Sequence, residues 1–306
     1  MGGARMSGRA SASASGPVLV AGASGYLGRY VVAELARRSI PVRALVRDRG
    51  RAQAAGPFGS PALEGLAAEW RVVRALDPAG LAGVAQGCTR VISALGVTRQ
   101  RADPWDVDFL ANLSLLREAE ACGKDDGTPV FTYVSALGAQ SPNAPVLRAK
   151  RALEEALARS RVLGQTVRPS GYFSDAEAFL QMARRGRVWL VGEGSARFNP
   201  IHGADLAAFV IDLPLQRGLW SVGGPDALTY RQTGLLAFRA LGTRPRFGCV
   251  PEPAARAAIT AAARVSPRIA GVGQFMVDSL TRDSLGEPTG SHHLAEYFRR
   301  RAGAEA

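Results

Sequence analysis

The sequence feature that most constrains the fold is a glycine-rich loop between a short apolar run and a helical pattern. Residues 17–21 are apolar and predict a buried parallel strand, while apolar residues recur at helical spacing over residues 26–38. Glycines at such a junction allow a tight turn and let the backbone approach a pyrophosphate at the helix N-terminus. The first two glycines are three residues apart, where the common dehydrogenase fingerprint has them two apart. The loop, which we expect to bind a dinucleotide, consists of Gly22, Ala23, Ser24, Gly25, Tyr26, Leu27 and Gly28.

Short apolar runs alternate with amphipathic segments along most of the chain. This alternation predicts an α/β fold, a Rossmann-type doubly wound parallel sheet. The regularity loosens after Pro169. Predicted strands cover residues 17–21, 42–46, 71–73, 90–95, 130–135, 165–168, 188–191 and 220–222, and predicted helices cover 26–38, 78–86, 106–121, 145–160, 204–213, 254–263 and a segment from Tyr230.

The chain is therefore expected to have three regions. Residues 1–16 are small, arginine-containing and without acidic side chains, and they predict a disordered extension. Residues 17–170 form the predicted dinucleotide-binding core. Residues 171–300 form a smaller C-terminal lobe on the substrate side, packed on the same domain.

The formal net charge of +12 raises the possibility of nucleic-acid binding. The 38 basic residues include only Lys124 and Lys150, so 36 of them are arginines. The arginines are scattered without interleaved aromatic residues, which favours a solvated basic surface. No run approaches the roughly 18 apolar residues of a membrane span. We therefore expect a small-molecule partner, no nucleic acid and no membrane association.

Cysteine and histidine usage gives no sign of a disulfide framework or a metal site. Cys88, Cys122 and Cys249 are far apart and odd in number, which is typical of reduced thiols and predicts a cytoplasmic location. No Cys/His spacing resembles a zinc site, so no metal is expected.

The choice of nicotinamide cofactor is expected to depend on the end of the second predicted strand. Arg47 comes first there, followed by Asp48, with Arg43, Arg49 and Arg51 nearby. The planar guanidinium matches the oxygens of the 2′-phosphate of NADP, whereas a lone acidic residue would favour the ribose of NAD. NADP(H) is therefore favoured over NAD(H). The alternative is that these arginines only reflect the arginine bias of the chain.

Several longer segments carry a family resemblance. GASGYLGRYVVAEL, VRALVRD, VISALG and FTYVSALG resemble the extended and atypical short-chain dehydrogenase/reductase superfamily, in particular its NmrA-like branch. RPSGYFSD, NPIHGADLAAFV, VGGPDALTYRQ and GSHHLAEYF agree, and are also similar to divinyl chlorophyllide vinyl-reductases. The resemblance extends over residues 17–298.

The resemblance implies roles for several residues. Ser135 and Lys150 stand where the family has its catalytic serine and lysine, but the family's tyrosine position is taken by Val146. Valine has no proton to give, so the usual tyrosine acid/base step cannot operate there. The vinyl reductases also lack that tyrosine and keep the lysine. Contacts with the cofactor are implied for Asp77, Ala94, Leu95 and Gly96.

Lys150 is also notable as a lysine in a chain that otherwise uses arginine. A compact ammonium can bind the ribose hydroxyls of a nicotinamide cofactor, and burial is expected to lower its pKa. The alternative is an incidental surface lysine on a charged helix, because Arg148, Arg151, Glu154 and Glu155 surround it.

Tyr172, Phe173 and His202 are candidates for the wall of a substrate pocket. Alternatively, the two aromatic residues only pack, and His202 only makes a hydrogen bond at the start of a helix. Together the features predict an NADP(H)-dependent reductase of a small organic molecule with a conjugated double bond or a carbonyl group. The alternatives are a non-catalytic NmrA-like regulator or redox sensor, and a tetrapyrrole vinyl reductase.

Overall fold

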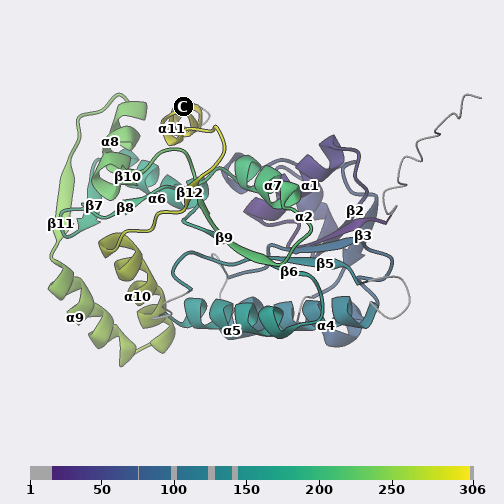
Figure 1. Cartoon of the computed structure of the whole chain (residues 1–306). Helices are drawn as coiled ribbons and strands as arrows, with labels where there is room; N and C mark the ends of the chain where they lie inside the picture. Colours follow the sequence, from purple (N-terminus) through teal and green to yellow (C-terminus); the bar gives the residue numbers. More distant parts are fainter. Residues whose placement is uncertain (1–15, 75, 98–101, 123–127, 140–143, 304–306) are drawn as a thin grey trace, which may run out of the picture.

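The computed structural model describes residues 16–74, 76–97, 102–122, 128–139 and 144–303, so residues 1–15 of the predicted extension lie outside the described part. The main sheet contains β1 (Val18–Ala21), β2 (Val42–Val46), β3 (Glu69–Val72), β4 (Arg90–Ser93), β5 (Val130–Val134), β6 (Gly164–Pro169), β9 (Gly218–Gly223) and β12 (Glu287–Pro288). Their order is β12-β9-β6-β5-β4-β1-β2-β3, and all neighbours pair in parallel (Figure 1). This confirms the predicted Rossmann-type sheet.

Helices cover both faces of the sheet. On one face lie α1 (Tyr26–Arg37), α2 (Arg49–Gln53) and α7 (Gly203–Asp212), and on the other lie α4 (Asn112–Cys122) and α5 (Pro145–Arg159) (Figure 1). The short helix α3 (Pro78–Leu81) packs beside α4. Val31 and Val210 help to fill the first layer of the core, and Leu115 and Leu153 the second. The central strands β1, β4 and β5 are buried, which explains the nearly continuous apolar runs that predicted them.

Two of the predicted helices differ from the structure. The segment 106–121 begins as a π-helix, η2 (Trp105–Ala111), and only then continues as α4. The helix predicted at 78–86 ends at Leu81, because Ala82 leaves helical geometry and Gly83 has a φ of 68°. A π-turn inserts an extra residue and is common at functional sites.

The lobe has its own aromatic core. Phe173, Phe179, Tyr230 and Phe298 pack inside it. The sequence did not predict α6, although its buried residues follow a helical spacing. The lobe contains α6 (Phe173–Arg184), β7 (Val188–Val191), β8 (Arg197–Phe198), β10 (Leu228–Thr229), α8 (Tyr230–Ala240), β11 (Phe247–Val250), α9 (Glu252–Ala263), α10 (Pro267–Thr281) and α11 (Leu294–Gly303).

The residues predicted as the lobe are divided between two places. α7 packs on α1, and β9 pairs with β6 through the register Val167↔Trp220. β12 then extends the sheet beyond β9. Segments of the sheet layer and segments of the lobe therefore alternate along the chain, so that the Rossmann core and the lobe are interleaved. No helix in the described ranges is long and apolar enough to cross a membrane.

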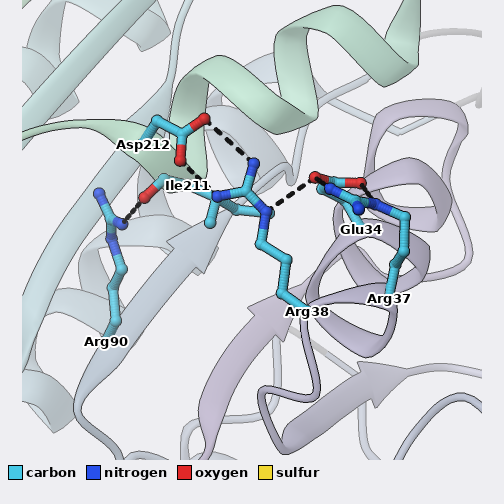
Figure 2. A network of polar contacts seen from close by, with 6 residues as sticks. All are labelled: Glu34, Arg37, Arg38, Arg90, Ile211 and Asp212. Atoms are coloured by element: carbon cyan, nitrogen blue, oxygen red, sulfur yellow. Dashed lines mark hydrogen bonds and ion pairs between the residues drawn. The ribbon is translucent and has the colours of Figure 1, made fainter. Parts of the chain in front are cut away.

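An arginine network ties α1 to α7 at one side of the sheet (Figure 2). Arg38 donates hydrogen bonds to Glu34, at 2.7 Å, and to both carboxylate oxygens of Asp212. Beside it, Arg90 of β4 donates to the carbonyl oxygen of Ile211 at 3.0 Å. The network joins elements separated by more than half of the chain.

Arg38→Ala should lower the free energy of unfolding by about 0.5–1 kcal/mol at pH 7, the scale of a partly exposed ion pair. Hydrogen bonds from Arg37 and Arg38 lower the pKa of Glu34 from 4.5 to about 2. A lowered pKa in the folded chain means that the stabilisation is complete above pH 4.5 and disappears as the pH falls toward 2. Thermal unfolding at several pH values should show the difference between wild type and variant shrinking in acid. A difference that grows in acid would contradict this assignment.

Candidate functional site

The glycine loop lies against the end of β4 at the carboxyl edge of the sheet. Gly22 has a φ of 76°, and a Cβ atom there would lie 2.9 Å from the carbonyl oxygen of Ala94. A Cβ on Gly28 would lie 2.1 Å from the Gly22 carbonyl oxygen. The loop therefore closes onto the residues that follow β4. The crevice between β1 and β4 is where open α/β sheets bind dinucleotides.

Gly25 is the position of the loop that faces outward. It is exposed, and a Cβ there would meet only the Gly22 carbonyl oxygen, at 3.2 Å. The side chains of Ala23 and Leu27 are buried in the core, so only their backbone can face a ligand. Within the described chain, no side chain caps the N-terminus of α1 and no acidic residue lies in its first turn. The amide groups of this turn can therefore bind an anion.

Arg29, which was not predicted from the sequence, holds the glycine loop in place through hydrogen bonds. Its side chain is 1% exposed. Burial lowers the pKa of its guanidinium. The guanidinium donates hydrogen bonds of 2.7–3.1 Å to the carbonyl oxygens of Ser24, Arg51, Ala52, Ala54 and Pro61. These contacts hold the segment after β2 against the glycine loop.

The arginines near the end of β2 fall into two groups. Arg43 is buried and pairs with Glu69 at 2.7 Å, so it belongs to the sheet rather than to a ligand site. Arg47 is exposed. Asp48 accepts a hydrogen bond from the amide of Arg51 at 3.0 Å, which makes it the N-cap of α2. The Asp48 carboxylate, next to Arg47 in the sequence, therefore stabilises the start of α2.

The segment after β4 connects the glycine loop to a buried ion pair. Asn112 of α4 donates hydrogen bonds to the carbonyl oxygens of Leu95, Val107 and Asp108, which fixes this segment against η2. A Cβ on Gly96 would lie 3.0 Å from Asp108 Oδ1 and 3.4 Å from Lys150 Nζ. Further along the edge, Asp77 accepts a hydrogen bond from the Gly80 amide at 3.2 Å and caps α3.

Lys150 and Asp108 form that ion pair. Lys150 Nζ lies 2.9 Å from Asp108 Oδ1, and the Asp108 side chain is completely buried. Asp108 Oδ2 accepts a hydrogen bond from the Val97 amide at 3.0 Å. Burial alone lowers the pKa of Lys150, as expected from the sequence, but the Asp108 carboxylate reverses this effect and the pKa lies above its ordinary value. The expectation of a lowered pKa is therefore wrong, and Lys150 carries its positive charge at neutral pH.

Two phenols act on Lys150. Tyr133 of β5 is fully buried, and Lys150 Nζ lies 5.6 Å from the centroid of its ring. Tyr172 follows β6, and its ring is 5.9 Å from that of Tyr26 in the glycine loop. Burial raises the pKa of both phenols, and the Lys150 ammonium opposes that rise. Tyr172 was predicted from the sequence as a pocket residue, whereas Tyr133 and Asp108 were not.

Ser135 belongs to a separate buried network. Its hydroxyl donates a hydrogen bond to Glu154 at 2.6 Å, and Glu154 also accepts one from Arg168 Nε at 2.9 Å. The single proton of the serine is thus directed toward Glu154, while Lys150 is directed toward Asp108. Val146 is half-buried at the start of α5, one turn before Lys150.

Phe173 and His202 lie in the aromatic packing between the sheet and the lobe. The ring of Phe173 is 5.4 Å from that of His202, which stacks on His292 with 4.2 Å between ring centroids. His202 Nδ1 accepts a hydrogen bond from the Ala204 amide at 3.2 Å and caps α7. Burial lowers the pKa of His202 to about 4, so its ring is neutral at pH 7. These contacts match the alternative of a helix-entry hydrogen bond.

Comparison with known proteins identifies the family of this chain. A family model described as NAD(P)H-binding matches residues 22–215. The divinyl chlorophyllide a 8-vinyl-reductase of Oryza sativa subsp. indica is 35% identical over 284 residues, which cover 84% of this chain and 67% of that protein. The enzyme of the same name from Zea mays is 32% identical over 76% of this chain and 61% of its own length. The chain thus spans about two thirds of the length of these relatives.

Solved structures with little sequence identity share the fold. An NADPH-dependent quinone oxidoreductase of Escherichia coli, complexed with NADPH, superposes with a TM-score of 0.70 at 19% identity and covers 93% of this chain and 99% of its own. A triphenylmethane reductase of Citrobacter sp. gives a TM-score of 0.72 at 14% identity, covering 94% and 99%.

Proposed function

Because this chain belongs to the NAD(P)H-binding Rossmann family, we propose that it is an NADP(H)-dependent reductase of the NmrA-like, atypical short-chain dehydrogenase/reductase type. Its substrate is a small organic molecule with a conjugated double bond or a carbonyl group. The observation that carries this proposal is the charged Lys150, held by Asp108 beside Gly96 and next to the glycine loop. A positive charge buried at that edge stabilises the negative charge that develops when a substrate accepts a hydride.

The residues of the loop fit a dinucleotide. The exposed, side-chain-free Gly25 and the uncapped N-terminus of α1 leave room and amide donors for a pyrophosphate. When bound, NADPH supplies the hydride. Lys150 donates hydrogen bonds and positive potential but keeps its own proton, because Asp108 raises its pKa. The proton that completes the reduction therefore comes from another pocket group, for which Tyr172 is a candidate, or from water.

The relatives support a finer proposal. Reduction of a tetrapyrrole vinyl group is the activity printed in the names of the plant proteins, of which the Oryza protein is 35% identical to this chain. The test is NADPH oxidation with a divinyl tetrapyrrole beside a panel of enones and quinones. Turnover of the tetrapyrrole alone supports the vinyl-reductase proposal, and turnover of quinones alone contradicts it.

A regulator that binds the cofactor without chemistry is the second candidate function, favoured by one observation: Val146 supplies no proton. NADPH binding without oxidation by any member of the panel would support the regulator.

We also propose a location in a reducing compartment such as the cytoplasm. Cys88, Cys122 and Cys249 form no disulfide among the described residues, which is typical of such a compartment. The curated relatives are named as chloroplastic.

Arg47→Ala should weaken NADPH binding by about ten- to a hundredfold and leave NADH binding nearly unchanged. The reason is the loss of a charge-assisted contact with the 2′-phosphate, worth roughly 1.5–3 kcal/mol. Calorimetric titration with both cofactors measures the effect. Arg37→Ala, which removes an exposed arginine on α1 that pairs with Glu34, is the matched control. Tighter binding of NADH than NADPH by the wild type would overturn this assignment.

A further inference from the structure

Three side chains from separate elements meet beneath Gly96. Asp108 comes from η2, Tyr133 from β5 and Lys150 from α5. Asp108 and Tyr133 are both 0% exposed. Asp108 Oδ1 lies 2.9 Å from Lys150 Nζ, which in turn lies 5.6 Å from the centroid of the Tyr133 ring. The cluster is thus a largely buried polar group, in which the Lys150 side chain keeps 13% of its surface exposed.

The hydroxyl of Tyr133 is the unusual member of this cluster. It is buried, and no described residue meets the geometry of a hydrogen bond to it; the same is true of Asp108 Oδ1, which nevertheless lies 2.9 Å from Lys150 Nζ. An unpartnered buried hydroxyl destabilises a fold, and phenylalanine would fill the same space without that cost. Phe131, two residues earlier on the same strand, is buried in the same core layer. A purely structural role therefore does not explain a tyrosine at position 133.

The position of Asp108 is equally specific. The π-helical turn places its carboxylate between Lys150 and the segment after β4, where Oδ2 accepts the Val97 amide at 3.0 Å. This contact links the Lys150 charge to the backbone that borders the glycine loop. Movement of that segment on ligand binding would be transmitted to the ion pair.

Building on the proposed function, we propose that Asp108 and Tyr133 are positioning residues for Lys150. Asp108 holds the ammonium group at the Gly96 edge. The phenol of Tyr133 donates a hydrogen bond to the Asp108 carboxylate when the Lys150 ammonium turns to a ligand. Asp108 and Tyr133 act on the reaction through Lys150 and do not themselves contact the substrate.

The charge of Lys150 depends on the groups that face it. They are Asp108 from η2, Tyr133 from β5 and Tyr172 from the segment after β6. Burial lowers the pKa of Lys150, and Asp108 provides the largest opposing effect. Without the Asp108 carboxylate, the lowering of the pKa by burial is opposed only by the two phenols. The pKa of Lys150 should therefore fall below its ordinary value of 10.5.

The lysine content makes a direct test possible. Lys124 and Lys150 are the two lysines of the chain, so a Lys124→Arg protein labelled with ¹³C-lysine gives one lysine signal. In that background Lys150 should keep its charge through the alkaline range, whereas Asp108→Asn should make it titrate below pH 10.5. Glu177→Gln, which removes a similarly buried carboxylate paired with Arg301 in the lobe, should not shift the signal. An Asp108→Asn titration identical to that of the background would overturn the role of Asp108.

Tyr133→Phe tests the phenol. We expect an unchanged or higher Tm together with NADPH binding that is weaker by about two- to tenfold, the range of one net hydrogen bond. A structural role alone would not lower affinity while preserving stability. Unchanged affinity in the variant would overturn the role of Tyr133. If the wild type binds no NADPH, the proposed function fails, whereas the Lys150 titration still tests Asp108 on its own.

Discussion

Lys150→Ala should slow single-turnover hydride transfer by about 10²–10³-fold, the cost of removing a preorganised donor from a site of developing negative charge. Lys150→Arg keeps the charge but changes its shape and hydration, and should also lose most of the activity. Stopped-flow oxidation of bound NADPH, with a substrate taken from the quinone, enone and tetrapyrrole panel, measures both effects. Transfer at the full rate in Lys150→Ala would remove the lysine from the mechanism.

Three control variants separate effects on chemistry from effects on folding and substrate fit. Removing Lys150 leaves the buried Asp108 charge without its partner, a change that can destabilise a protein by about 3–5 kcal/mol. The double variant Lys150→Ala/Asp108→Asn removes both charges and should recover most of that stability without recovering activity. Arg148→Ala removes an exposed cation from the same helix and should leave the rate unchanged. Val146→Phe should alter substrate fit alone, because position 146 supplies no proton.

Gly25→Val should abolish dinucleotide binding while the chain remains folded. The added side chain would occupy the exposed side of the loop, where the backbone must approach the pyrophosphate, and its Cβ meets only one protein atom, at 3.2 Å. The measurements are fluorescence titration with NADPH and thermal unfolding without cofactor. Wild-type affinity in a folded Gly25→Val protein would contradict the cofactor site.

Gly28→Ala is the contrasting control. A Cβ there would lie 2.1 Å from the Gly22 carbonyl oxygen and 2.8 Å from Ala23 Cα. This overlap involves backbone atoms that cannot move easily, so the variant should lose about 1–3 kcal/mol of stability before any cofactor is added. Substitution of Gly25 is therefore expected to abolish cofactor binding, whereas substitution of Gly28 is expected to lower stability, although both glycines belong to one motif.

The sequence pattern predicted the central strands β1, β4 and β5 well because they are short, buried and nearly uniformly apolar, whereas it did not predict the exposed edge strand β12. It predicted the glycine loop because strand, glycines and helix are contiguous. Asp108 was missed because a carboxylate in an amphipathic helix is ordinarily solvated, and only the π-turn directs it inward. Tyr133 was missed because it lies within a strand of mostly apolar residues, where a tyrosine ordinarily only packs. Arg29 was missed because the chain contains many arginines and nothing in the sequence sets this one apart.

Contacts between distant segments account for the other differences. The pairing of β9 with β6 brings residues 218–223 beside residues 164–169, and nothing in either segment alone specifies the other. Similarly, His202 meets His292 only because the C-terminal segment returns to the start of α7. A site assembled from such contacts has no local signature in the sequence.

With the lobe on the substrate side, as the sequence predicts, the interleaved chain path has a consequence for how substrate preference can change. The lobe is built from residues 173–198, 228–281 and 294–303, with α7, β9 and β12 returning to the sheet between them. A single genetic crossover between two related genes would therefore combine lobe segments from both parent proteins within one aromatic core. We expect chimaeras with one junction to fold poorly, and new specificity to arise by point substitutions or by the exchange of all three segments together.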